Sequence, residues 1–213
     1  MTIRNQSKVE LAYDNTVSYY TLSAVSRMIN NTGNLDISDS TITNTDFNVT
    51  RDNGRTNGIY NAGGTINFTN TTVEVSRYES YGIYNESGTT NIESGTIKTS
   101  GYNARSLWVK DGSINMGEAE PTDSPDYGQD TAHVDTAAPY IEALGSNSGI
   151  GVTLETGSFR FYDGKIVQKS EVGPAVQANG VDKATVTDVE YLYQPEKYQD
   201  ENGNYYFILE FMR

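Results

Sequence analysis

The sequence predicts an all-β protein built as a parallel β-solenoid, a chain that winds through successive coils of short strands. Three observations lead to this fold class. A tetrapeptide recurs after 24 residues, strand-like segments follow each copy in the same order, and turn residues separate these segments. Hydrophobic residues make up 36% of the 213-residue chain, which is too few for a thick core but enough for a thin one shared between neighbouring coils.

The recurring tetrapeptide is Gly-Ile-Tyr-Asn, at residues 58–61 and again at residues 82–85. Segments of the same kind fill the slot at residues 28–30, 107–109, 152–154 and 176–178. The step from Leu107 to Val152 is 45 residues, which corresponds to two coils or to one coil with a long insertion. Identical slots in successive coils stack into ladders about 4.8 Å apart. The slot therefore predicts the first strand of each coil.

Two further segments complete the predicted coil. The second alternates in polarity and recurs at residues 35–37, 66–68, 90–92, 114–116 and 159–161. The third recurs at residues 41–43, 72–75, 96–98 and 165–167, and glycine-containing turn signals stand between segments at 63–64, 94–95 and 163–164. A sandwich or barrel of hairpins is the competing all-β fold. Hairpins, however, would not require the same residue class in the same slot every 24 positions.

One family resemblance rests on the run from Gly82 to Ile97 and on the later run 159–166. Both resemble repeat units of bacterial right-handed parallel β-helix proteins of the pectin-lyase-like superfamily, especially adhesin-like surface proteins. The resemblance covers residues 26–116 and 149–190, and it implies a right-handed parallel β-helix with an extracellular or cell-surface location. It implies little about activity, because this fold hosts lyases, hydrolases, tailspikes and adhesins.

The repeat divides the chain into a β-helix domain, residues 1–190, and a C-terminal segment, residues 191–213. The C-terminal segment is rich in large apolar residues around a hairpin-like turn at 201–204, so it predicts capping strands or a continuation into another domain. Residues 117–148 contain three prolines and no Lys or Arg, and we expect an acidic loop insertion there. Its acidic residues are Glu118, Glu120, Asp123, Asp126, Asp130, Asp135 and Glu142. Calcium is one hypothesis for this loop, but the spacing matches neither an EF-hand nor a nonapeptide calcium repeat, and no metal site is predicted.

Strand alternation predicts which side chains face outward. If Ile59 and its equivalents fill the interior, then Tyr60, Tyr84 and Trp108 form one outward column. Stacked aromatic rings would make a flat platform for the apolar faces of sugars, or else a ladder that stabilises neighbouring coils.

Asparagines form two further predicted columns. Asn67, Asn91 and Asn115 are expected beside the aromatic column, where their amides could bind sugar hydroxyls or bond to one another. A third column, Asn30, Asn61 and Asn85, lies nearer a turn and is expected to be structural.

No catalytic residue or cofactor is predicted. Glu74 and Glu93 are isolated in their columns, Arg160 and Lys98 have no evident catalytic neighbour, and the single histidine, His133, lies in the acidic loop. A polysaccharide lyase or glycoside hydrolase of β-helix fold remains the alternative, because a carboxylate pair such as Glu155 and Asp111 could still form.

Charge and composition restrict the partners. The net charge of −13 and the pI near 4.4 argue against nucleic acid and against anionic membrane surfaces. The chain has no cysteine, no apolar run long enough for a membrane span, and no recognisable leader after Met1. The resemblance to adhesin-like β-helix proteins implies one module of a larger bacterial surface protein that acts in adhesion, in carbohydrate binding or as a spacer. Its partner would be a glycan or another cell-surface ligand.

Overall fold

The computed structural model describes residues 2–3, 8–10, 25–44, 55–76, 78–117, 138–144, 149–161, 164–168, 176–178, 181–182, 196–199 and 205–208. Within these ranges the secondary structure consists of strands and turns, and no helix occurs. The prediction of an all-β protein is confirmed. Among the same residues, no helix of the length and apolarity that a membrane span requires is found.

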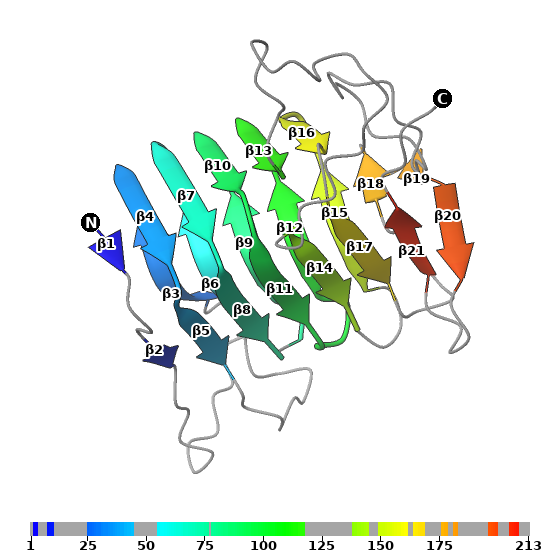
Figure 1. The fold of residues 1–213 in the computed structure, drawn as a ribbon, viewed down its shortest axis with the longest axis horizontal. Coiled ribbons are helices and arrows are strands. Elements are labelled where there is room, and N and C mark those ends of the chain that lie inside the picture. Colours follow the sequence, from blue (N-terminus) through cyan, green and yellow to red (C-terminus); the bar gives the residue numbers. More distant parts are fainter. Residues whose placement is uncertain are drawn as a thin grey trace.

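The strands form three sheets, which we name A, B and C (Figure 1). Sheet A contains β1 (Thr2–Ile3), β4 (Asn34–Ser38), β7 (Thr65–Thr69), β10 (Thr89–Ile92), β13 (Ser113–Met116) and β16 (Ser158–Phe161). Sheet B contains β2 (Lys8–Glu10), β5 (Thr41–Asn44), β8 (Thr71–Val75), β11 (Gly95–Thr99), β14 (Tyr140–Ala143), β17 (Lys165–Gln168), β21 (Tyr205–Ile208) and β20 (Glu196–Gln199). Sheet C contains β19 (Val181–Asp182), β18 (Val176–Ala178), β15 (Ile150–Leu154), β12 (Arg105–Val109), β9 (Tyr81–Asn85), β6 (Arg55–Asn61) and β3 (Val25–Asn31).

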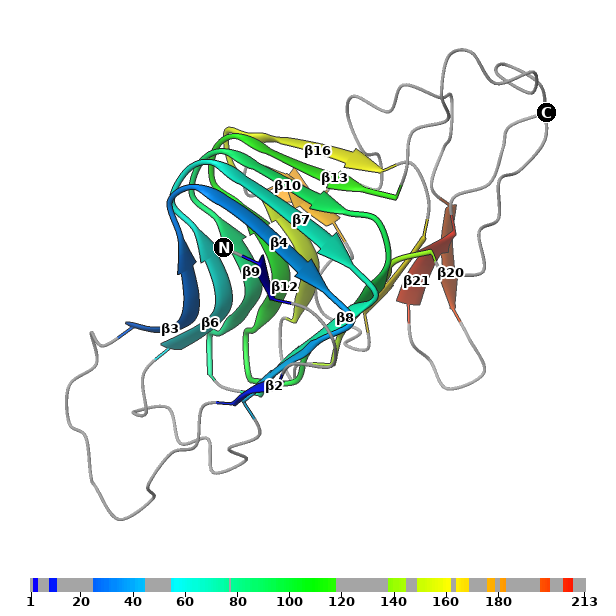
Figure 2. The ribbon, with the colours of Figure 1, turned by 60° about the vertical axis from the view of Figure 1, so that its left-hand side comes forward.

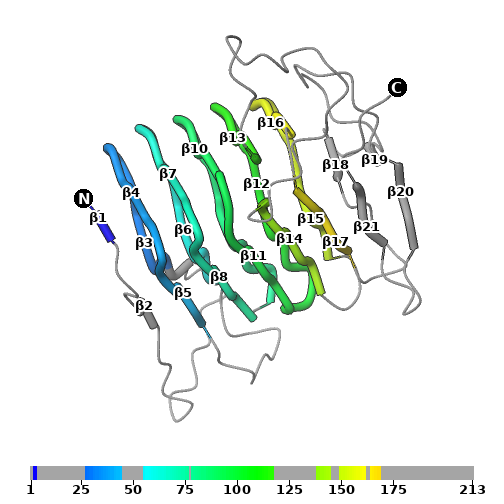
Figure 3. Tube along the Cα trace, in the orientation of Figure 1, coloured from blue at the N-terminus to red at the C-terminus, as the bar shows by residue number. Residues whose placement is uncertain are grey.

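The chain visits the sheets in the fixed order C, A, B, so each passage forms one rung with one strand in each sheet. Neighbouring strands from β1 to β18 pair in parallel and come from successive rungs. Figure 2 shows the three sheets as walls around a common interior, and Figure 3 shows the chain advancing along the stack. The protein is therefore a parallel β-helix, and the hairpin sandwich is excluded.

The interior is a continuous column of apolar side chains. In sheet C, Ile59, Ile83, Leu107 and Val152 occupy one register position and are fully buried. Sheets A and B contribute buried residues in the same way, including Phe68, Phe159, Phe161, Ile97 and Ile166. Burying each such side chain contributes roughly 1.5–3 kcal/mol. The low apolar content of the chain is sufficient because every rung shares its core with the two rungs beside it.

The first rung departs from the predicted register by one residue. Ile29, not Met28, pairs with Ile59, and Asn31 pairs with Asn61. The turn from β3 to β4 runs from Asn31 to Asn34, whereas the turn from β6 to β7 runs from Asn61 to Thr65 and is one residue longer. The shorter turn shifts the preceding strand, so the slot predicted at 28–30 is wrong by one position, and Asn30 does not belong to the turn column.

Buried asparagines connect successive rungs at the turn from sheet C to sheet A. Asn31 Nδ2 donates a hydrogen bond to Asn61 Oδ1 (3.0 Å), and Asn61 Nδ2 donates one to Asn85 Oδ1 (2.9 Å). Asn85 Nδ2 donates to the Asp111 carbonyl (2.8 Å). Asn61 and Asn85 are fully buried, and buried amides require such partners. The structural role predicted for this column agrees with these contacts, with Asn31 in place of Asn30.

Glycines line the same turn. A Cβ atom at Gly88 would lie 2.3 Å from the Gly64 carbonyl oxygen, and a Cβ at Gly112 would lie 2.1 Å from the Gly88 carbonyl oxygen. Both glycines also have positive φ angles, of 83° and 73°. The turn therefore requires glycine at these positions for two reasons, namely the positive φ angle and the close approach of neighbouring rungs.

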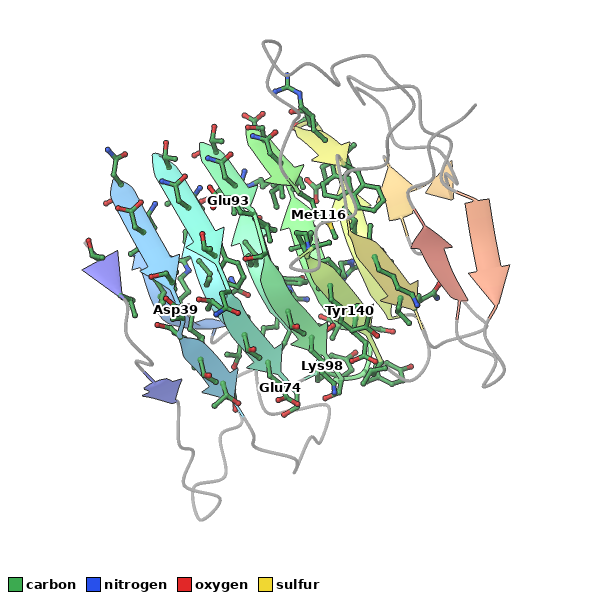
Figure 4. All side chains as sticks on the ribbon, in the orientation of Figure 1. Asp39, Glu74, Glu93, Lys98, Met116 and Tyr140 are labelled. Carbon is green, nitrogen blue, oxygen red and sulfur yellow. The ribbon has the colours of Figure 1, made fainter. Side chains whose placement is uncertain are left out.

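The insertion is shorter than predicted at its C-terminal end. β14 lies inside the predicted loop 117–148, and it pairs with β11 and β17 as an ordinary strand of sheet B. β12 pairs directly with β15, so the 45-residue step is one coil with an insertion between Met116 and Tyr140, the ends of β13 and β14 labelled in Figure 4. Of the predicted acidic residues, Glu142 lies on β14, 3.4 Å from Lys98 Nζ. The other six, and His133, lie outside the described residues.

The C-terminal strands pair antiparallel, unlike the rungs. β21 pairs with β17 at the edge of sheet B, β20 pairs with β21, and β19 pairs with β18 in sheet C. The predicted turn at 201–204 lies outside the described residues, and a capping role for this segment stays a prediction.

Candidate functional site

Five strands of sheet C, β3, β6, β9, β12 and β15, each have two positions, three residues apart, on the side away from the core. A Cβ atom at Gly58 would meet Val73 Cγ1, and one at Gly82 would meet Ile97 Cγ2, so these glycines face the core together with the isoleucines that follow them. Two consecutive inward residues leave the residues on either side facing outward. The first outward column is Arg27, Asn57, Tyr81, Arg105 and Ile150, and the second is Asn30, Tyr60, Tyr84, Trp108 and Thr153. We call these two columns the sheet C face.

The predicted aromatic column exists, but it is not flat. The ring centroids of Tyr60 and Tyr84 are 5.4 Å apart with an interplanar angle of 47°, and those of Tyr84 and Trp108 are 5.3 Å apart at 65°. Tyr60 is buried, with 5% of its surface exposed, while Tyr84 and Trp108 are partly exposed. The rings contact their neighbours in edge-to-face and tilted arrangements, which aromatic quadrupoles favour. The expected flat platform is therefore replaced by a ridged surface open at Tyr84 and Trp108.

Tyr81 joins this cluster, although the repeat alone did not reveal it. Its ring meets Trp108 edge-on, with centroids 4.6 Å apart at 89°, and lies 5.5 Å from Tyr84. The signal was present in the sequence, because the segment YGIYN carries Tyr81 where the segment NGIYN carries Asn57. Only the two inward residues between Tyr81 and Tyr84 place both tyrosines on one face.

Two arginines lie over the aromatic rings. The Arg27 guanidinium carbon is 3.5 Å from the Tyr60 ring centroid, and that of Arg105 is 4.9 Å from the Trp108 ring. Cations in such positions are attracted by the negative face of the ring, by about 0.5–2 kcal/mol. Sequence analysis did not assign either arginine. Simple alternation does not predict the i, i+3 contact of Arg105 with Trp108, nor the contact of Arg27 with Tyr60 on the next rung.

Acidic and basic pairs flank the sheet C face. Lys110 Nζ donates a hydrogen bond to Glu86 Oε1 (3.1 Å), and Arg55 forms an ion pair with Glu79. Glu155 adds a negative charge near Lys110 and Tyr84. The hydrogen bond to Glu86 raises the pKa of Lys110. These exposed pairs contribute little to stability, because water and salt screen them, but each pair neutralises its own charges beside the aromatic cluster.

Burial raises the pKa of Tyr81 and of Tyr84, and nearby Arg105 and Lys110 respectively offset part of this rise. A raised folded-state pKa means that these phenols ionise more readily in the unfolded chain. Their contribution to stability is therefore complete below the ordinary tyrosine pKa and is lost as the pH rises through the folded value.

We expect the Tyr81→Phe, Tyr84→Phe double variant to lose the last-titrating part of the phenolate absorbance curve. An unchanged upper end of that curve would show that neither phenol is shielded.

The predicted asparagine column lies on a different sheet. Asn67, Asn91 and Asn115 face outward from sheet A, whereas the aromatic column faces outward from sheet C, and the two sheets meet at an angle (Figure 2). Asn91 Nδ2 donates to Asn67 Oδ1 (2.9 Å), Asn115 Nδ2 donates to Asn91 Oδ1 (2.8 Å), and Asn67 Nδ2 donates to Asp36 Oδ1 (2.8 Å). The prediction that these asparagines adjoin the aromatic column is wrong. They form a hydrogen-bonded ladder along another surface.

The acidic residues considered for catalysis are dispersed among the described residues. Glu74 lies on sheet B beside Lys98, whereas Glu93 lies apart from them, directly after a strand of sheet A (Figure 4). Glu93 accepts a hydrogen bond from Thr69 Oγ1 (2.9 Å). Asp111 and Glu155 occupy the turn from sheet C to sheet A in neighbouring rungs. In the parts of the chain that the structure describes, no group of three His, Cys, Asp or Glu residues is arranged to hold a metal ion.

A second aromatic contact lies in the turns from sheet B to sheet C. Tyr78 and Tyr102 stack nearly parallel, at 8° with centroids 5.3 Å apart, and Tyr102 is 41% exposed. Sequence analysis did not single out this pair. It provides an aromatic surface outside the sheet C face.

Comparison with models of protein families, with characterised proteins and with solved structures found no match. The function is therefore inferred from the residues of this chain alone.

Proposed function

We propose that this chain is a non-catalytic module of a bacterial surface protein that binds carbohydrate through the sheet C face. The proposal includes an extracellular location and a right-handed helix of the pectin-lyase-like kind, both suggested by the motif in residues 82–97. The rungs would serve as a rigid spacer that presents this face at a distance from its attachment.

The observation that carries the proposal is the partly exposed pair Tyr84 and Trp108. These rings lie outside the apolar interior, whose column is completed by Ile83 and Leu107 on the same strands. Core packing therefore does not require large aromatic residues at these two positions. The buried rings of Tyr60 and Tyr81 contact these two rings. Preordered aromatic side chains lose little conformational entropy on binding, and their faces suit the apolar C–H faces of sugar rings.

A glycan array probed with the wild-type protein and with the Tyr84→Ala, Trp108→Ala double variant tests the proposal. We expect the double variant to lose binding by about tenfold to a hundredfold, the effect of removing one or two buried aromatic contacts. Tyr102→Ala is the matched control, because it removes an exposed ring from the other aromatic pair.

The outcomes separate the claims. Loss of binding in Tyr102→Ala with full binding in the double variant would move the site to the Tyr78–Tyr102 pair and overturn the assignment to the sheet C face. Binding of no glycan by the wild-type protein would overturn carbohydrate binding itself.

A further inference from the structure

Tyr78 and Tyr102 occupy the same position in two successive rungs. Each lies in a turn from sheet B to sheet C, at residues 76–80 and 100–104, and these two turns have the same length. The tyrosines are 24 residues apart, which is the interval between the paired strands on both sides of the turns, β8 with β11 and β9 with β12. The repeat therefore places one tyrosine directly beside the other along the stack.

The backbone holds the two turns together. The Glu79 amide donates a hydrogen bond to the Tyr102 carbonyl oxygen (2.7 Å), and the Arg105 amide donates one to the Ser80 carbonyl oxygen (2.9 Å). The residue after each tyrosine, Glu79 or Asn103, has a positive φ angle, of 46° and 54°. The two turns thus share a backbone feature as well as a length, and the pairing of the rungs sets the distance between the two side chains.

The rings of Tyr78 and Tyr102 are both close and accessible. They lie nearly parallel, with an interplanar angle of 8° and centroids 5.3 Å apart. Such stacking brings carbons of the two rings near van der Waals contact, about 3.5–4.0 Å. Tyr102 is 41% exposed and is the one exposed large hydrophobic side chain among the described residues, while Tyr78 is partly exposed. Two phenols are therefore held side by side where a reagent in solution reaches them.

The tyrosine pairs of the sheet C face differ in both respects. The rings of Tyr60 and Tyr84 are tilted by 47°, and those of Tyr81 and Tyr84 by 38°. Tyr60 and Tyr81 are each 5% exposed. Burial also raises the pKa of Tyr81 and of Tyr84, so these phenols release a proton less readily. A reaction that joins two accessible, parallel phenols will therefore favour the pair in the turns.

We propose that Tyr78 and Tyr102 form a site of oxidative cross-linking, at which a haem peroxidase with hydrogen peroxide converts the two phenols into a dityrosine. Each phenol loses one electron and one proton to become a phenoxyl radical. The two radicals join through a new carbon–carbon bond between the ring carbons ortho to the oxygens. The hydrogen on each of these carbons then moves to the oxygen and restores the phenol. The two electrons and two protons that are released reduce one hydrogen peroxide to two waters.

The product would be a covalent link between neighbouring rungs. The chain has no cysteine, so it cannot form a disulfide for this purpose. A bond between Tyr78 and Tyr102 closes a loop that contains β9, β10 and β11. Closing a loop restricts the unfolded chain and leaves the folded chain with little more to lose, which is how a disulfide stabilises a fold.

Oxidation of the folded protein with one equivalent of hydrogen peroxide and a haem peroxidase tests the proposal. Trypsin cleaves after lysine and arginine, so it releases Tyr102 in the peptide 99–105, where it is the only tyrosine, and Tyr78 in the peptide 78–98. We expect the digest of the monomeric fraction to contain these two peptides joined, with a mass two hydrogens below their sum. Fragmentation of the joined peptides should place the bond at Tyr78.

Phenylalanine variants identify the reacting pair. Tyr78→Phe and Tyr102→Phe each keep a ring but remove the phenol, and each should abolish the joined peptides. Tyr84→Phe is the matched control, because it removes a phenol from the tilted rings of the sheet C face, and it should leave the yield of joined peptides unchanged. Far-ultraviolet circular dichroism of every variant confirms that the fold is retained.

Urea unfolding of the cross-linked monomer gives a second measurement. We expect its midpoint to rise by about 1 M or more relative to the untreated protein, the effect of a closed loop of this length. The oxidised Tyr102→Phe variant should show no such rise. A cross-linked product with an equal or lower midpoint would show that the bond forms only in distorted turns, and it would overturn the proposal.

Other products would overturn the proposal directly. Joined peptides that persist in Tyr78→Phe, with the bond at Tyr81 or Tyr84, would show that a different pair reacts. Dityrosine confined to dimers, or peroxide consumed with no joined peptides, would show that the two rings do not meet in the folded chain as the structure places them. These results leave the proposed carbohydrate binding untouched, because the glycan array tests that function with other residues.

Discussion

Replacing Gly88 with alanine is expected to lower the free energy of unfolding by about 2–5 kcal/mol, or to prevent folding. The added Cβ would lie 2.3 Å from the Gly64 carbonyl oxygen and 2.7 Å from the Gly64 amide nitrogen. That carbonyl accepts a hydrogen bond from the Thr89 amide (2.8 Å), so it cannot move away without breaking the pairing of the two rungs. Overpacking typically costs about 1–3 kcal/mol, and the φ of +83° adds about 1–2 kcal/mol for a residue with a side chain.

Urea unfolding followed by circular dichroism measures this loss. Gly33→Ala is the matched control, because Gly33 stands near the same turn of the first rung and a Cβ there would meet no heavy atom within 4 Å. We expect Gly33→Ala to change stability by no more than about 0.5 kcal/mol. Similar losses in the two variants would show that the rungs do not approach as closely at Gly88 as the structure places them.

Replacing Asn61 with alanine is expected to cost about 2–4 kcal/mol of stability. Asn61 is fully buried, donates to Asn85 Oδ1 and accepts from Asn31 Nδ2. Its loss interrupts the ladder in the middle, and it leaves a small cavity beside donors and acceptors that water cannot reach. Each buried group left without a partner costs about 1–3 kcal/mol, and the two neighbours retain some of their other bonds.

The same truncation at Asn67 provides the comparison for Asn61. Asn67 belongs to the hydrogen-bonded ladder of Asn67, Asn91 and Asn115 on sheet A, and its hydrogen bond to Asp36 is exposed to solvent. Water can replace that bond, so we expect Asn67→Ala to cost less than about 1 kcal/mol. Thermal unfolding of both variants, with circular dichroism at one wavelength, gives the difference. A larger loss at Asn67 than at Asn61 would contradict the expectation that the buried asparagine bonds stabilise the rungs more than the exposed ones do.

Much of the fold could be predicted because the information is local and repeated. A strand with one buried face alternates in polarity, and a solenoid repeats that pattern at a constant interval. The registers Ile59–Ile83–Leu107 and Asn67–Asn91–Asn115 are the ones that the repeat predicts. The predicted register of the first rung was wrong by one residue, also for a local reason. The turn from β3 to β4 is one residue shorter than the turn from β6 to β7, and the polarity pattern of β3 does not reveal this difference.

The candidate site was less predictable, because it depends on departures from alternation. Two inward residues in succession, Gly82 and Ile83, place Tyr81 on the same face as Tyr84. The same spacing on β12 places Arg105 over Trp108. A strict period of two would have turned Tyr81 toward the core. Arg27 and Arg105 are notable because they contact aromatic rings, and such contacts are not visible in a sequence.

The sequence by itself determined that this chain is a parallel β-solenoid, which residues fill its interior, and that Tyr60, Tyr84 and Trp108 share one column. These properties follow from the periodicity of the sequence, because the same pattern recurs in every rung. Only the tertiary structure decided that the asparagine and aromatic columns lie on different sheets. The turn after Asn61 changes the direction of the chain, and sequence distance across such a turn says nothing about the angle between the walls that it joins.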